Sequence, residues 1–137
     1  MIVGDNRLAA QAALRQAQAL GYRSLLLSTF VEGEARVVAQ VVAALAKEVR
    51  ASGQPIPAPA CLILGGETTV TLADGGARCG RGGRNQELGV AAALALQGVA
   101  GVTLAALATD GSDGPTDSAD ALVDGETVAR GAAQSTS

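Results

Sequence analysis

The sequence contains no histidine and no tryptophan, and its single lysine is Lys47. A Ser-His-Asp hydrolase, a zinc site with histidine ligands and a histidine general base are therefore excluded within these residues. A phosphate-binding loop that ends in Gly-Lys-Ser/Thr is also excluded, because Lys47 lies in a stretch with a helical pattern. Any chemistry here must depend on arginine, carboxylates, hydroxyl groups and backbone amides.

Basic charge and long apolar runs are scarce as well. Ten lysine and arginine residues stand against 13 aspartate and glutamate residues, so the formal net charge is -3. Nucleic-acid binding needs a basic surface, which this balance does not favour. The longest apolar stretch, residues 88–96, is too short to cross a bilayer, and residues 1–7 lack the core of a signal peptide. We expect a cytoplasmic protein with no nucleic-acid or membrane partner.

Cysteine and aromatic residues are few. Cys61 and Cys79 form no Cys-x-x-Cys motif, and we expect two reduced thiols, with Cys61 buried in a strand. The only aromatic residues are Tyr22 and Phe30, yet 48% of the residues are hydrophobic. The core must therefore consist of Ala, Val, Leu and Ile, a composition that suits helices packed closely on a sheet. The length of 137 residues is typical of one domain.

Several stretches have helical patterns. Asp5 and Asn6 offer capping oxygens for a helix that runs to about residue 20, although both could instead be polar groups at the rim of a site. A second helix begins at Glu34 and carries an inward apolar stripe. Residues 85–97 are apolar on nearly every side, which indicates a helix buried on several sides. A last helical turn is expected near Thr127.

Strands alternate with these helices. Residues 24–29 and 61–64 are continuous apolar runs, typical of strands buried on both faces. The second run is expected to stop at a glycine pair and to resume over residues 67–72 as an antiparallel strand. Residues 102–107 predict a further strand, and residues 109–125 a long acidic loop. The pattern predicts an α/β fold, a layered mixed, mostly parallel sheet flanked by helices.

Three polar loops are candidates for a functional site. They are Gly65-Gly66-Glu67-Thr68-Thr69, Gly80-Arg81-Gly82-Gly83-Arg84-Asn85-Gln86-Glu87 and Thr109-Asp110-Gly111-Ser112-Asp113-Gly114-Pro115-Thr116-Asp117. Ligands of open α/β sheets collect where strands end at their carboxyl edge. Because two of the loops follow predicted strands, we expect all three to share one rim.

The second loop has the features of an anion site. Gly82 and Gly83 leave backbone N–H groups unshielded just before a predicted helix, where the helix dipole attracts anions. Arg84 follows them with a planar fork that suits a carboxylate or a phosphate. The alternative is a tight turn followed by a solvated arginine.

The third loop has the opposite charge. Asp110, Asp113 and Asp117 are spaced like ligands of a hard cation, and Mg²⁺ held by one or two carboxylates and by substrate phosphates would fit. The alternative is a capped surface turn, since Asp, Gly, Ser and Pro are ordinary turn formers. Glu67, in the first loop, could bind a substrate hydroxyl or orient Arg84, or it could be an exposed strand end.

Taken in order, these motifs resemble the glycerate 2-kinases of the MOFRL-containing family, which was long labelled hydroxypyruvate reductase. The resemblance covers nearly the whole chain and is more specific than any single loop. The segments that carry it are Gly4-Asp5-Asn6, Gly33-Glu34-Ala35, Gly65-Gly66-Glu67-Thr68-Thr69-Val70-Thr71, Gly82-Gly83-Arg84-Asn85-Gln86-Glu87, Thr109-Asp110-Gly111 and Asp113-Gly114-Pro115-Thr116-Asp117.

The resemblance implies a kinase that transfers a phosphoryl group from ATP to D-glycerate with Mg²⁺, usually giving 2-phosphoglycerate. Members have two α/β domains with the active site in the cleft between them. Residues 1–137 resemble the second, C-terminal-type domain, with a MOFRL-like segment at about 60–137 that is truncated at its end. The larger domain, with the active-site lysine, is the expected partner, so this fragment alone is expected to be inactive. Asp120 stands where the family usually has glycine.

The resemblance also implies residue roles. Arg84, Asp110 and Asp113 are the expected catalytic residues, and the two aspartates are the expected Mg²⁺ ligands. The expected substrate-binding residues are Gly65, Gly66, Glu67, Thr68, Gly82, Gly83, Asn85 and Thr109. Two other functions remain open. A hydroxypyruvate reductase would normally need a Gly-x-Gly-x-x-Gly motif, which does not occur here, and a non-catalytic binding module would need no catalytic group.

Overall fold

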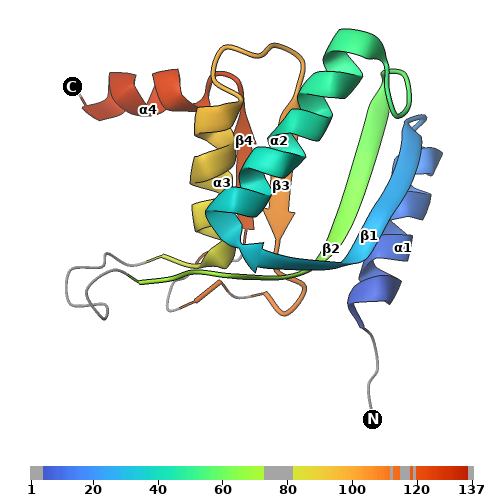
Figure 1. The fold of residues 1–137 in the computed structure, drawn as a ribbon, viewed down its shortest axis with the longest axis horizontal. Helices are drawn as coiled ribbons and strands as arrows, with labels where there is room; N and C mark the ends of the chain where they lie inside the picture. Colours follow the sequence, from blue (N-terminus) through green and yellow to red (C-terminus); the bar gives the residue numbers. More distant parts are fainter. Residues whose placement is uncertain (1–4, 73–81, 112, 115–117, 119, 136–137) are drawn as a thin grey trace.

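The computed structural model of the protein describes residues 5–72, 82–111, 113, 114, 118 and 120–135. Helices and strands alternate along most of the chain (Figure 1). In chain order they are α1 (Asn6–Ala19), β1 (Arg23–Glu34), α2 (Ala35–Ser52), β2 (Ala60–Thr69), α3 (Arg84–Ala95), β3 (Thr103–Leu107), β4 (Asp120–Asp124) and α4 (Thr127–Ser135). None of the helices in the described ranges is long and apolar enough to cross a membrane.

The described strands form two small sheets. β1 and β2 pair in parallel, whereas β3 and β4 pair antiparallel. α1 packs against β1 and β2, α2 packs against α3 and also contacts β1 and β2, and α3 covers β3 and β4 (Figure 1). The predicted α/β class, with parallel and antiparallel strands flanked by helices, is confirmed, although the described strands belong to two sheets.

The course of β2 differs from the prediction. The strand does not stop at Gly65 and Gly66 but continues to Thr69 in parallel register with β1, so the predicted antiparallel strand over 67–72 is wrong. Gly66 has a φ of 153°, and a Cβ atom there would lie 2.6 Å from the backbone nitrogen of Val31. Glycine therefore lets the two strands approach closely at the point where their pairing register shifts.

The antiparallel strand lies later in the chain. β4 occupies part of residues 109–125, which the sequence predicts as a loop, and it pairs with β3 along its whole length. Val123, the fourth of its five residues, is buried, whereas Asp120 and Asp124 form its ends. A five-residue strand with acidic ends has too short an apolar pattern to be distinguished from a loop.

The core lies between α2, α3, β3 and β4. Its buried members are Ala39, Ala43, Ala92, Ala93, Leu96, Leu104 and Val123. The distance between packed helices depends on the side chains at their contact, so the four alanines allow α2 and α3 to lie close together. The two aromatic residues are outside this core, since Tyr22 and Phe30 are both exposed.

Two predictions of burial are wrong. β1 and β2, including Cys61, are half-buried instead of buried on both faces, and among the described residues each pairs with one other strand only. α3 is buried along Gly89, Ala92 and Ala93, but it exposes 63% of Val90 and 59% of Leu94. Its apolar sequence therefore covers a solvent-facing side as well as the core side.

Candidate functional site

The predicted site residues lie in β2, at the start of α3 and after β3. Gly65, Gly66, Glu67 and Thr68 belong to β2; Gly82 and Gly83 precede α3; Arg84 and Asn85 open α3; Thr109, Asp110 and Asp113 follow β3. Asp117 lies outside the described residues. Contacts at the start of α3 join the first loop to the second and the second to the third.

The first of these contacts is the ion pair between Arg84 and Glu67. Nη1 of Arg84 donates a hydrogen bond to Oε1 of Glu67, and the same nitrogen lies 3.5 Å from the carbonyl oxygen of Thr68. The side chains are 50% and 76% exposed, respectively. An ion pair this exposed contributes about 0–1 kcal/mol to stability. The guanidinium can therefore exchange Glu67 for an anionic ligand at little energetic cost.

The second contact is made by Asp113, which is only 3% exposed. Its Oδ1 accepts a hydrogen bond from the backbone N–H of Asn85 at 3.0 Å, and its Oδ2 accepts one from Gln86 at 2.8 Å. A Cβ atom at Gly83 would lie 2.5 Å from the backbone oxygen of Asp113, so glycine is needed there. This carboxylate thus binds two amides in the first turn of α3, which follow the Gly82 and Gly83 amides that the sequence offers to an anion.

The turn after β3 is exposed at Thr109 and Asp110. Gly111 closes it with φ of 80° and a hydrogen bond from its N–H to the carbonyl oxygen of Ala108 at 3.2 Å. Asp120 accepts a hydrogen bond from the N–H of Ala108 at 3.2 Å. Asp120 therefore anchors the start of this loop, a role that the sequence did not indicate.

A hollow of about 260 Å³ lies beside Glu67. It is lined by Asn6, Thr29, Phe30, Val31, Glu32, Gly66 and Glu67. Nδ2 of Asn6 donates to the carbonyl oxygen of Thr29 at 2.7 Å, and Cγ of Asn6 would lie 3.0 Å from a Cβ atom at Gly65. Asn6 thus connects α1 to both strands next to the site. The sequence offered it as a helix-capping or rim residue; the cap itself is Asp5, which accepts from Leu8.

A tether next to the hollow links the ends of β1 and β2. The hydroxyl and the N–H of Thr71 both donate to the carboxylate of Glu34, the latter at 3.2 Å. The hydroxyl bond is the main reason why the pKa of Glu34 is lowered from its ordinary value of 4.5. Glu34 also occupies the N-cap position of α2, but its side chain makes no capping bond there. Its carboxylate instead fixes the chain that leaves β2.

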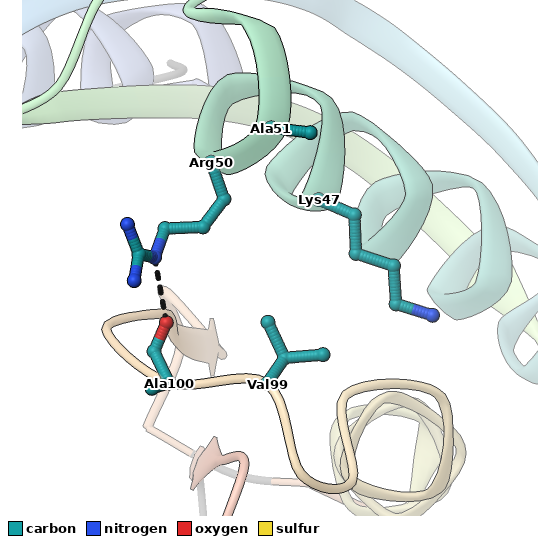
Figure 2. A pocket seen from close by; sticks show the side chains of 5 residues that line it. All are labelled: Lys47, Arg50, Ala51, Val99 and Ala100. Carbon is teal, nitrogen blue, oxygen red and sulfur yellow. Dashed lines mark hydrogen bonds between the residues drawn. The ribbon is translucent and has the colours of Figure 1, made fainter.

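A second hollow, of about 320 Å³, lies beyond the other end of α3. It is lined by Lys47, Arg50, Ala51, Val99 and Ala100 (Figure 2). Nε of Arg50 donates to the carbonyl oxygen of Ala100 at 2.8 Å. Both cations lie near the C-terminus of α2, where positive charge is favoured by the helix dipole. Lys47 therefore lies beside the segment that follows α3 and not beside the first residues of that helix.

No group of three or more potential metal ligands occurs within the described residues. Mg²⁺ commonly uses only one or two protein carboxylates, together with water and substrate phosphates. Asp110 is exposed and could serve in this way. The remaining predicted ligand, Asp113, already binds two backbone amides.

The sequence is similar to proteins that are named as glycerate kinases or as hydroxypyruvate reductases. The chain is 40% identical over 127 residues to the D-glycerate 2-kinase of Thermotoga maritima. This alignment covers 93% of this chain and 30% of that protein. It is 36% identical to the glycerate 2-kinase of Pyrococcus horikoshii, over 92% of this chain and 28% of the relative. A protein of Agrobacterium vitis that is named as a hydroxypyruvate reductase is 41% identical over 94% of this chain and 29% of its own length.

The fold has a matching solved structure. The crystal structure of glycerate kinase from Thermotoga maritima superposes with a TM-score of 0.90 at 38% identity, covering 98% of this chain and 32% of that one. The chain thus spans about a third of the length of the relatives it matches. The model of the MOFRL family matches residues 60–137, which is more than half of the sequence. The chain therefore belongs to the MOFRL family.

Proposed function

We propose that this chain is the substrate-binding half of a kinase that transfers a phosphoryl group from ATP to D-glycerate and gives 2-phosphoglycerate. The observation that carries the proposal is the half-exposed Arg84 at the start of α3, paired with the exposed Glu67 of β2. Relatives at 36% and 40% identity are named as glycerate 2-kinases, which supports the same substrate. D-Glycerate offers a carboxylate for the arginine and hydroxyl groups for the glutamate.

Arg84 would neutralise the glycerate carboxylate or the phosphoryl group in transfer. Phosphoryl transfer depends mainly on positioning and electrostatic stabilisation, and an arginine fork suits both anions. Glu67 and Asn85 would orient the substrate, with Thr68 and Thr109 as further polar contacts. The backbone at Gly65, Gly66, Gly82 and Gly83 would allow the substrate to approach closely. These roles fit the exposure of Arg84 and Glu67.

Mg²⁺ fits the carboxylate of Asp110, which is exposed on the turn after β3. When bound there, the ion would neutralise charge on the phosphates of ATP. The rest of ATP would be bound mainly by another domain. We propose that this partner is the larger N-terminal domain of the same enzyme, because the chain spans about a third of the relatives. The enzyme would act in the cytoplasm.

The test uses the intact two-domain protein with D-glycerate, ATP and Mg²⁺. We expect ADP formation that depends on D-glycerate and a product identified as 2-phosphoglycerate. Residues 1–137 alone are expected to fold and to show negligible turnover, because one side of a cleft cannot assemble the transition state. Full activity of the isolated chain would overturn the two-domain proposal.

The second candidate is a hydroxypyruvate reductase, which the name of the Agrobacterium vitis relative favours. The discriminating assay follows NADH oxidation with hydroxypyruvate in the same protein preparation. Oxidation of NADH without any glycerate-dependent ADP would reject the kinase. ADP formation without NADH oxidation would reject the reductase.

A further inference from the structure

We infer that Asp113 is a positioning residue that caps α3 and holds Arg84 in place, and that it is not a ligand of Mg²⁺. The kinetic consequence rests on the proposed kinase function, but the structural role does not. Asp113 and Asp110 are both candidate metal ligands by sequence. The structure gives the two carboxylates different surroundings, since Asp110 is exposed and Asp113 is 3% exposed.

α3 begins without a capping side chain of its own. Its N-cap residue is Gly83, with φ of −142° and ψ of 178°, and this residue has no side chain to offer. The first N–H groups of any helix lack partners within the helix and are usually satisfied by an N-cap side chain. Here the amides of Asn85 and Gln86, which a cap normally satisfies, donate to the two oxygens of Asp113. A residue 27 to 28 positions away thus replaces the missing cap.

The space around Gly83 is matched to this arrangement. A Cβ atom at Gly83 would lie 2.5 Å from the backbone oxygen of Asp113. A second close approach joins Gly114, which follows Asp113, to Gly82, which precedes Gly83. Gly114 has φ of 62°, and a Cβ atom there would lie 2.7 Å from the backbone oxygen of Gly82. Glycines on both sides therefore let the third loop lie against the start of α3, close enough for the carboxylate to reach the amides.

The capped residues are directly next to Arg84, the first residue of α3. Fixing the N–H groups of the first turn fixes the backbone from which the arginine side chain extends. The guanidinium then reaches Glu67 in β2. Asp113 thus determines where the cationic fork lies without touching the substrate.

The same contacts argue against Mg²⁺ at Asp113. A protein carboxylate that binds Mg²⁺ shares the ion with water molecules and substrate phosphates, so it must face the solvent-filled site. Each oxygen of Asp113 instead accepts a backbone N–H, and the residue is almost wholly buried. Binding the ion there would compete with the cap of α3.

The experiment compares Asp113→Ala and Asp113→Asn in the intact protein. Hydrogen–deuterium exchange at Asn85 and Gln86 is expected to be at least about tenfold faster in Asp113→Ala, with exchange in α2 unchanged. Asp113→Asn keeps the shape and one acceptor oxygen, so its exchange is expected to be intermediate. This variant also serves if Asp113→Ala does not fold. Unchanged exchange at both amides in both variants would overturn the inference.

Kinetics provide the second readout. We expect kcat/KM for D-glycerate to fall by about 10- to 100-fold in Asp113→Ala, the scale of a displaced catalytic group. The Mg²⁺ concentration for half-maximal activity is expected to stay unchanged. An equal rise of tenfold or more in this concentration for both variants would identify Asp113 as a metal ligand and overturn the inference.

Asp124→Ala is the matched control. Asp124 accepts the N–H of Glu126 and pairs with Arg130 at the start of α4, so its loss removes a similar contact from another helix. Neither kcat/KM nor exchange at the start of α3 should change in this variant. If the wild-type protein has no glycerate kinase activity, the proposed function fails, and the exchange measurement still decides the role of Asp113.

Discussion

The two charged contacts at the start of α3 differ in their exposure and in the group that the carboxylate binds. The pair between Arg84 and Glu67 is exposed and joins two long, flexible side chains. Both charged groups are therefore accessible to a ligand. The contact between Asp113 and the amides of Asn85 and Gln86 is buried and joins a short side chain to the backbone. An exposed pair exchanges partners easily, whereas a buried cap fixes geometry. The first contact is therefore suited to binding and the second to positioning.

The largest expected effect comes from removing the exposed cation. In the intact enzyme, Arg84→Ala should lower kcat/KM for D-glycerate by at least about 100-fold, the scale of losing one preorganised charge contact. Arg130→Ala is the matched control, because Arg130 is also paired with a carboxylate, that of Asp124, and its side chain is 53% exposed. Steady-state kinetics measure kcat/KM for D-glycerate in both variants. Wild-type kinetics in Arg84→Ala would exclude Arg84 from the site.

The next effect tests the close approach at the buried contact. Gly83→Ala should lower the free energy of unfolding by about 1–3 kcal/mol, the usual cost of an overpacked site. Gly82→Ala, one residue earlier, should change it by less than about 0.5 kcal/mol, because nothing lies within 4 Å of a Cβ atom there. Urea denaturation measures both. Equal stability of the two variants would show that the third loop does not lie against Gly83.

A smaller effect on stability is expected at the other member of the exposed pair. Glu67→Gln should change the free energy of unfolding by less than about 1 kcal/mol, as for other exposed ion pairs. In the intact enzyme it should raise the KM for D-glycerate, since Glu67 is proposed to orient the substrate. Glu126→Gln, in an exposed pair with Arg130, is the control and should leave this KM unchanged. A large loss of stability in Glu67→Gln would contradict the exchangeable character of the pair.

The sequence predicts the local features of this molecule well. Asp5 was a candidate N-cap for the first helix, and its carboxylate does accept the N–H of Leu8 at 2.8 Å. The second helix was predicted to begin at Glu34, and α2 begins one residue later, with Glu34 as its N-cap residue and Gly53 as its C-cap with a left-handed φ of 74°. These features depend on residues a few positions apart. The shared rim stays a prediction, although Arg84 contacts Glu67 of the first loop and Asp113 of the third loop binds the first turn of α3.

Long-range contacts account for what the sequence did not predict. β2 passes through its glycine pair because Gly66 meets the backbone of Val31, 35 residues earlier in the chain and invisible to a local pattern. β4 exists because β3 offers it a partner and α3 covers its inner side. The capping role of Asp113 depends on a missing side chain at Gly83. A spacing rule that counts carboxylates could not separate Asp113 from Asp110.

The smallest effect concerns pH and the tether between β1 and β2. The hydrogen bond from the Thr71 hydroxyl holds the pKa of Glu34 below its ordinary value of 4.5. The tether therefore stabilises the fold fully above the unfolded-state pKa, and its contribution is lost as the pH falls through the lowered folded-state value.

An NMR titration of the Glu34 carboxyl group should give a midpoint below 4.5 in the wild type and closer to 4.5 in Thr71→Val. This variant keeps the size of the side chain and removes the hydroxyl, but it retains the bond from the Thr71 N–H to Glu34, so part of the lowering should remain. Identical midpoints in the two proteins would show that the hydroxyl of Thr71 does not bind the carboxylate.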